Sequence, residues 1–170
     1  MTGLVSPRKL ARHDVVEGFD CGVPELDQWL TRFAWENQAA HNATTYVTVD
    51  SGRVVGYYAI CMAAVSKNAA PQGINPNRRP SQIPCVLLAR LAVDSTWHGR
   101  GLGIGMLRDC LVRAIGLSES IAAAAVLVHC RDENAKLFYL AHGDFLTSPV
   151  DPLQLMVPIK VLSRYFDGQR

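Results

Sequence analysis

The chain has 170 residues, of which 49% are apolar and 19% charged, values typical of a folded globular protein with one sizeable core. Its net charge of +2 neither requires nor excludes a nucleic-acid partner. No apolar run approaches the roughly 20 residues that span a bilayer, and no apolar signal segment follows the basic N-terminal residues. We therefore expect one domain over residues 1–170, located in the cytoplasm, with no membrane partner.

The first half of the chain predicts a helix followed by a hairpin. Pro24 begins a pattern of helical period whose apolar stripe consists of Leu26, Trp29, Leu30, Phe33 and Ala34. The β-branched segment 44–49 predicts a strand, 50–52 a turn, and 53–65 a second strand. The segment 67–84 contains five prolines or glycines that interrupt regular structure, so we expect a loop or a broken short helix there.

The second half predicts alternating strands and helices. Its near-continuous apolar character predicts a strand at 86–93 that is buried on both faces. A helix follows from Ile104 to Ile115, with Gly116 as its expected stop. Further strands are expected at 122–128 and 153–159, and further helices at 133–141 and 161–165. The fold class is therefore α/β (α+β), with a mixed central sheet flanked by helices.

The cysteines and histidines do not form a metal-binding pattern. The sequence has no Cys-x-x-Cys and no His-x₃-His spacing, so we expect buried apolar thiols and no metal. The cysteines are Cys21, Cys61, Cys85, Cys110 and Cys130.

The most informative segment is 88–103, where an apolar strand leads through a glycine-dense turn into a helix. Backbone N–H groups at such a helix N-terminus bind phosphate groups. A dinucleotide fingerprint G-x-G-x-x-G fails in both registers, because Ile104 or Met106 stands at its third glycine. No Gly-Lys pair of a nucleoside triphosphate loop is present either. Nicotinamide dinucleotides and nucleoside triphosphates are therefore disfavoured.

The pattern His98-x-x-Gly101-x-Gly103, preceded by Arg-Leu-Ala-Val-Asp at 90–94, resembles the pyrophosphate loop of the GNAT family of N-acetyltransferases. The resemblance implies a single GNAT domain with acetyl-CoA as cosubstrate. Strand residues would pair with its pantetheine arm, and the loop amides would hold its pyrophosphate. The family usually has Gln or Arg where His98 stands. The implied cofactor-binding residues are Leu91, Ala92, Val93, His98, Gly99, Arg100, Gly101, Leu102, Gly103, Asp132 and Phe138.

A second GNAT motif, N-x-x-A-x-x-x-Y-x-x-x-G-F, is matched in part at 132–145. Ala135 and Tyr139 agree with it, Asp132 replaces its Asn, and one extra residue separates Gly143 from Phe145. The resemblance implies that Tyr139 lies near the acetyl sulfur. A phenol with a pKa of about 10 stays protonated at neutral pH, so it can donate a proton to the departing thiolate.

A longer resemblance extends to toxin acetyltransferases of type II toxin–antitoxin systems (the TacT/AtaT-like group). It rests on the segments 19–22, 26–30, 45–47, 91–94, 101–103, 138–139 and 148–157. It implies acetylation of the α-amino group of aminoacyl-tRNA, which blocks translation, and a ribbon-helix-helix antitoxin as partner. It also implies a homodimer, and DNA contact only indirectly through the antitoxin.

The acceptor chemistry agrees with this implication. An α-amine with a pKa near 7.7–8.0 is about a tenth to a sixth neutral at pH 7, whereas a lysine amine is far below one per cent neutral. An α-amine therefore needs little help from a base; Asp132, Glu133 and His129 remain candidates. For the phosphates of tRNA, the best local cluster is Arg78 and Arg79, with Arg32 as an addition.

Two other functions remain open at this point. The same loop would serve an acetyltransferase of a small amine or a protein. Alternatively, the departures at His98 and Asp132 would suit a degenerate acetyltransferase that acts as a binding module and co-repressor.

Overall fold

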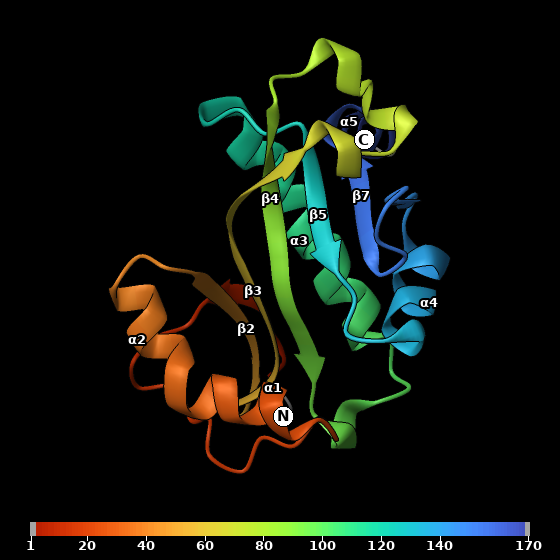
Figure 1. Ribbon diagram of the computed structural model, residues 1–170. Coiled ribbons are helices and arrows are strands. Elements are labelled where there is room, and N and C mark those ends of the chain that lie inside the picture. The colour runs from red at the N-terminus through yellow and green to blue at the C-terminus, as the bar shows by residue number, and fades with distance from the viewer. Residues whose placement is uncertain (1–2, 169–170) are drawn as a thin grey trace. The chain divides into compact units, whose positions relative to one another are not determined.

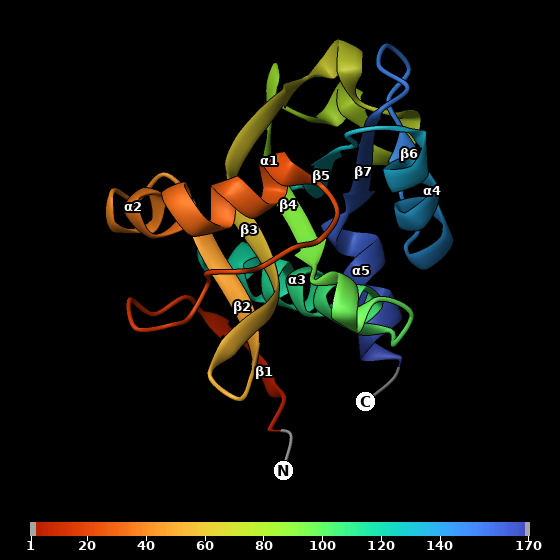
Figure 2. The same cartoon turned by 90° about the horizontal axis from the view of Figure 1, so that it is seen from below.

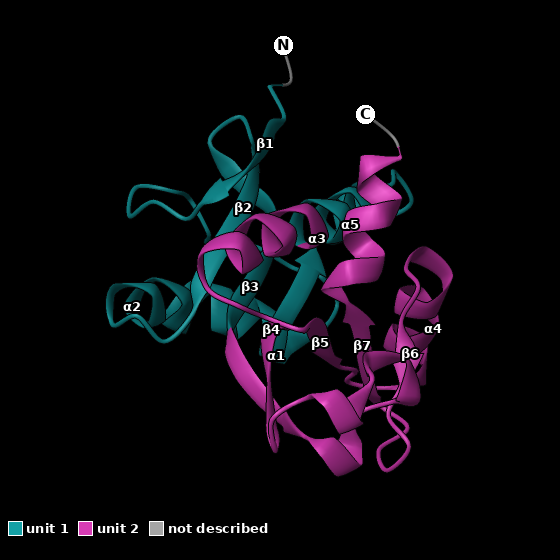
Figure 3. Cartoon of the chain, turned by 90° about the horizontal axis from the view of Figure 1, so that it is seen from above, with its two compact units in different colours: residues 1–61, 89–110 teal, residues 62–88, 111–170 magenta. Residues whose placement is uncertain are grey.

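The computed structural model describes residues 3–168 and contains a seven-stranded mixed sheet of order β1-β2-β3-β4-β5-β7-β6 (Figure 1). Strands β4 and β5 are parallel, while the β1–β2, β2–β3, β5–β7 and β6–β7 pairs are antiparallel. The mixed α/β fold predicted from the sequence is thereby confirmed. The chain divides into two compact units, residues 1–61 with 89–110 (unit 1) and residues 62–88 with 111–170 (unit 2) (Figure 3).

Unit 1 holds the N-terminal elements and the glycine-dense turn. Its complete elements are β1 (Val5–Lys9), α1 (Pro24–Gln28), α2 (Ala34–Ala39) and β2 (Thr44–Asp50). It also holds parts of β3 (Arg53–Ser66), β4 (Gln82–Val93) and α3 (Leu102–Ser120). Strands β2 and β3 form the predicted hairpin. Ser51 and Gly52 have φ of 51° and 83° at its tip, and two positive φ values define the type I′ turn that matches strand twist.

The predicted helix at Pro24 is interrupted by a wide turn. A π-helical segment, Trp29–Phe33, separates α1 from α2, and the N–H of Ala34 bonds to the carbonyl of Trp29, five residues back. Figure 2 shows the three pieces as one helical stretch that crosses β2 and β3. The wide turn shifts the apolar stripe: Trp29 and Ala34 are buried, but Phe33 is 45% exposed, so its predicted place in the core was wrong.

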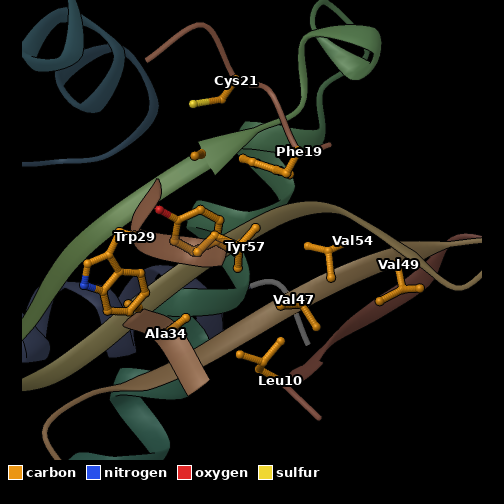
Figure 4. Packing of buried hydrophobic residues seen from close by; sticks show 12 residues of the cluster. Leu10, Phe19, Cys21, Trp29, Ala34, Val47, Val49, Val54 and Tyr57 are labelled. Atoms are coloured by element: carbon orange, nitrogen blue, oxygen red, sulfur yellow. The ribbon is translucent and has the colours of Figure 1, made fainter. Parts of the chain in front are cut away.

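The core of unit 1 is built around Tyr57 on β3. Its ring stacks on Trp29 at 5.9 Å and meets Phe19 edge-on at 5.7 Å, and its hydroxyl donates to the carbonyl of Leu26 at 2.7 Å (Figure 4). Burying a tyrosine requires such a partner for its hydroxyl. The helical stretch is thereby fixed to the sheet at Leu26 and Trp29.

Unit 2 holds the remaining elements. They are β5 (Ala125–His129), α4 (Glu133–His142), β6 (Leu146–Thr147), β7 (Gln154–Pro158) and α5 (Ile159–Asp167). The proline-rich segment forms three short 3₁₀ turns at Lys67–Ala69, Gln72–Ile74 and Pro76–Arg78, in agreement with the predicted loop or broken helix. Ile74 of this segment packs in a core with Ile83, Cys85, Leu127 and Met156.

Several predicted boundaries were wrong. Strand β4 begins at Gln82 and includes Pro84, whose carbonyl accepts the N–H of Ala124 at 2.8 Å. Proline in a strand loses only its donor, so pairing through the carbonyl continues. Helix α3 runs through Gly116 to Ser120, because glycine costs an α-helix only about 1 kcal/mol relative to alanine. Strand β5 starts at Ala125 rather than residue 122, and the predictions omitted β1 and β6.

The burial of β4 on both faces holds only for its first part. Between residues 89 and 93 only Ala92 is buried, whereas the other four are partly exposed. The thiols follow the prediction more closely: four cysteines are buried, Cys61 is partly buried, and all five are free. Within residues 3–168, no helix combines the length and apolar character that crossing a membrane requires.

Replacement of Leu127 tests the core of unit 2. Leu127 is 1% exposed, so Leu127→Ala removes buried contacts and should lower the free energy of unfolding by about 2–5 kcal/mol in urea titrations. The control Leu137→Ala removes the same atoms from a side chain that is 62% exposed on α4, and should change stability little. Equal losses in the two variants would contradict this assignment of the core.

Candidate active site

The glycine turn owes its shape to backbone conformation. After the 3₁₀ turn Ser95–Trp97, Gly99 and Gly101 have φ of 74° and 79°, which favour glycine. A Cβ at either position would meet no atom within 4 Å, so conformation, not space, requires these glycines. Helix α3 begins at Leu102, and the N–H of Gly105 bonds to the carbonyl of Gly101. The amides before Gly105 in the first turn have no intrahelical acceptor and are available to an anion.

A buried carboxylate holds the start of this turn. Asp94 is 3% exposed and accepts from the amide (3.0 Å) and hydroxyl (2.7 Å) of Thr96 and from the amide of Asp20 (3.1 Å). The guanidinium of Arg53 lies 3.5 Å away. Burial alone would raise the pKa of Asp94, but these hydrogen bonds and the charge of Arg53 outweigh it, and the pKa is lowered. Asp94 is therefore a charged anchor for the loop.

Side chains around the turn are locally engaged. The Nε2–H of His98 donates to the carbonyl of Val93 at 2.7 Å, which places a proton on Nε2. The guanidinium of Arg100 lies over the ring of Trp97, 4.7 Å from its centroid, and remains exposed. In the strand before the turn, Ala92 is buried, whereas Leu91 and Val93 are partly exposed. Unit 1 thus brings together every predicted cofactor residue between 91 and 103.

Tyr139 lies in unit 2, on α4. It is 8% exposed, and its ring meets those of Phe138 and Phe145 edge-on at 5.3 and 5.7 Å. A Cβ at Gly143 would approach the Phe145 ring to 2.7 Å, so this glycine leaves room for the ring. The extra residue before Phe145 is accommodated while Phe145 packs against Tyr139.

Asp132 caps the helix that carries Tyr139. Its Oδ1 accepts the amide of Ala135 at 2.9 Å, and its Oδ2 pairs with Arg131 at 2.9 Å. The capping bond satisfies a free amide in the first turn of α4. The two other candidate bases, His129 at the end of β5 and Glu133 at the start of α4, are exposed.

The predicted RNA-binding arginines lie in different units. Arg78 is exposed, but Arg79 donates through Nε to the carbonyl of Ile74 at 3.0 Å and is partly buried. Arg32, in unit 1, lines a shallow hollow of about 380 Å³. The remaining lining residues are Phe19, Pro24, Asp27, Gln28 and Thr31.

Sequence reasoning missed the Asp94 network and a cation–aromatic pair, Arg90 on Trp29, with 4.3 Å between the guanidinium and the ring centroid. Both link residues more than 40 positions apart. The Asp at the end of the 90–94 motif was a signal for the Asp94 network. No local pattern indicates the contact between Arg90 and Trp29.

A strand, an open glycine turn and a helix N-terminus in this order form an arrangement suited to an anion, such as the pyrophosphate of an acyl-CoA. The chain belongs to the acetyltransferase (GNAT) family, whose sequence profile matches residues 11–143. It is 41% identical, over 160 residues, to a tRNA-acetylating toxin of Mycobacterium tuberculosis; the match covers 94% of this chain and 95% of the relative.

Two solved structures of the AtaT toxin share the fold. AtaT complexed with acetyl-methionyl-tRNA has a TM-score of 0.89 at 23% identity, and covers 96% of this chain and 99% of that one. An AtaT mutant bound to the C-terminus of the antitoxin AtaR and to acetyl-CoA has a TM-score of 0.81 at 22% identity, and covers 96% and 98%.

Gly101→Val should weaken acetyl-CoA binding by about tenfold or more in calorimetry, because a β-branched residue at φ 79° distorts the turn. The control Gly105→Ala lies within α3, where a Cβ meets no atom within 4 Å. It should bind acetyl-CoA as the unsubstituted chain does. Unchanged affinity in Gly101→Val would contradict the assignment of this turn.

Asp94→Asn should lower the free energy of unfolding at pH 7 by about 1–3 kcal/mol, because it removes a charge from buried hydrogen bonds. The pKa of Asp94 is lower in the folded state, so its contribution is present above about pH 4 and is lost as pH falls through the folded pKa. Urea titrations at pH 7 and near pH 3 should therefore show the deficit shrinking. A deficit independent of pH, or one shared by the exposed Asp144→Asn, would refute the charged-anchor role.

Proposed function

We propose that this acetyltransferase is a toxin that transfers the acetyl group of acetyl-CoA to the α-amino group of aminoacyl-tRNA and so blocks translation. The observation that carries the proposal is the 41% identity to a tRNA-acetylating toxin over 94% of this chain. That likeness includes the N-terminal half, which lies far in sequence from the acetyl-CoA loop. The complex of AtaT with acetyl-methionyl-tRNA supports an aminoacyl acceptor.

The loop fits the pyrophosphate of acetyl-CoA. Its open glycines let an anion approach the backbone closely, and the first turn of α3 offers amides and the positive end of the helix dipole. In our proposal Leu91, Ala92 and Val93 hold the pantetheine arm, and residues 98–103 hold the pyrophosphate. Asp132 and Phe138 contribute from unit 2, the first by capping α4.

Acetyl-CoA supplies an acetyl group activated as a thioester. Tyr139 donates its phenolic proton to the departing sulfur, a role suited to a phenol that is protonated at neutral pH. The α-amine attacks as the neutral amine, which is already present at pH 7. The side chains of the site then need to orient the reactants and provide one proton.

Arg78, Arg79 and Arg32 contact tRNA phosphates in this proposal. Arg78 and Arg32 are exposed. Arg79 keeps its remaining guanidinium donors after its Nε bonds to the chain. Such contacts supply affinity without base recognition, so binding weakens as salt rises.

The partners follow from the same relatives. The complex of AtaT with the antitoxin AtaR supports an antitoxin partner for this chain, which we propose to be a ribbon-helix-helix protein. We further propose a cytoplasmic homodimer that contacts DNA only through the antitoxin.

Tyr139→Phe removes only the phenolic hydroxyl. It should lower the rate of acetyl transfer to charged tRNA by about 10²–10⁴-fold and abolish toxicity, because the leaving sulfur loses its acid. Acetyl-CoA affinity should stay within about threefold by calorimetry. Tyr165→Phe, on an exposed side chain of α5, is the matched control.

Transfer of label from acetyl-CoA to total charged tRNA is the assay. A fully active Tyr139→Phe variant would show that Tyr139 is not the acid. Label found only in protein or small metabolites would instead favour an acetyltransferase with another acceptor.

A further inference from the structure

Arg90 is a cation fixed in place by an aromatic ring. It lies on β4, directly before the proposed pantetheine residues, and is partly buried. Its guanidinium lies 4.3 Å from the centroid of Trp29. Trp29 is itself buried in the π-helical segment and stacked on Tyr57 (Figure 4). A rigid ring therefore orients the guanidinium plane.

No acidic residue in the described part of the chain neutralises Arg90. Among the described residues, Arg8 pairs with Asp14, Arg53 with Asp94, and Arg131 with Asp132. Asp27, on neighbouring α1, uses its Oδ1 to accept the amide of Cys21 at 2.8 Å.

The thiol and phenol facing Arg90 from β3 carry no charge at neutral pH. Burial raises the pKa of both Cys61 and Tyr57, while the charge of Arg90 acts in the opposite direction. The positive charge of Arg90 thus acts on its surroundings without a counter-ion.

Strand β4 determines where Arg90 lies relative to the pantetheine arm of the proposed acetyl-CoA. The glycine turn follows β4, so a pantetheine arm that starts at the turn runs back past Val93, Ala92 and Leu91. Three strand residues span about 10 Å. In the proposed function the thioester end of the arm therefore lies toward Arg90, and the acceptor amine must reach it there.

We propose that Arg90 binds the phosphodiester that joins the 3′-terminal nucleoside of the charged tRNA to the preceding nucleotide. This inference rests on the proposed function and adds a specificity-determining residue to it. In an aminoacyl-tRNA only the terminal ribose and the ester separate that phosphate from the α-amine. A guanidinium matches phosphate oxygens in a two-pronged geometry, and that of Arg90 lies over the Trp29 ring. The contact favours acceptors with a phosphate close to the reacting amine over free small amines.

The decisive comparison uses two acceptors with the same aminoacyl ester. One is a charged tRNA, and the other is the same amino acid esterified to adenosine, which has no phosphodiester. Arg90→Met should lower kcat/KM for the charged tRNA by about tenfold or more, and change it less than about twofold for the aminoacyl-adenosine. The slope of log(kcat/KM) against log salt for the tRNA should become shallower by about one. Arg90→Lys should recover part of the loss, because lysine keeps the positive charge but lacks the two-pronged donor geometry of the guanidinium.

Controls separate this role from a defect of folding or donor binding. Acetyl-CoA affinity should be unchanged in Arg90→Met, and Arg164→Met, on an exposed arginine of α5, should behave as the unsubstituted chain with both acceptors. An equal loss with both acceptors, or no loss with either, overturns the proposal. Failure of the proposed function is distinguishable, because the unsubstituted protein would then acetylate neither acceptor, which overturns both.

Discussion

The buried carboxylate of Asp94 is the interaction on which the shape of the glycine turn depends. It directly follows β4, caps the next 3₁₀ turn through Thr96, and accepts a hydrogen bond from the amide of Asp20, a residue 74 positions earlier. The amide of Ser95 returns a bond to the carbonyl of Asp20 at 2.8 Å, so two chain segments are joined by bonds in both directions. A glycine turn is intrinsically mobile. Fixing its entry from an already folded segment reduces the entropy lost when an anion orders it.

Backbone conformation and side-chain contacts have different roles in the glycine turn. Gly99 and Gly101 supply backbone angles that other residues adopt only with strain, and the start of α3 supplies amides. His98 and Arg100 are both engaged by their own segment, one on the Val93 carbonyl and the other on Trp97. His98 is therefore compatible with the turn, because its side chain bonds to the Val93 carbonyl while the first amides of α3 remain available to an anion. The side chains hold that backbone in shape.

The sequence predicted the features that depend on neighbouring residues. The β2–β3 hairpin, the glycine turn and α4 all have local signals, and all are present. The errors have tertiary causes. The π-helical turn places Trp29 and Ala34 in the core and releases Phe33, which a pattern of 3.6 residues cannot indicate. Strand β4 tolerates Pro84 because a distant amide pairs with its carbonyl.

The candidate site was likewise predictable from the sequence only in part. Motif spacing was sufficient to select residues 91–103 and Tyr139 as candidates, but their catalytic and binding roles remain proposals. The contacts that position these residues could not be predicted, because Asp20 with Asp94 and Trp29 with Arg90 meet only after folding. The local sequence around each of these residues contains no pattern that indicates which distant residue it contacts.

The arginines of this chain, whose net charge is only +2, differ in the partners that their guanidinium groups have. Arg8, Arg53 and Arg131 lie beside carboxylates, which offset most of their charge. Arg90 and Arg100 instead lie on the rings of Trp29 and Trp97. An aromatic face orients a guanidinium without neutralising it, so such an arginine keeps its full attraction for phosphate while losing less entropy on binding. In the proposed function, affinity for tRNA comes from individually placed cations, among them Arg32, Arg78, Arg79 and Arg90, because a net charge of +2 supplies little attraction at long range.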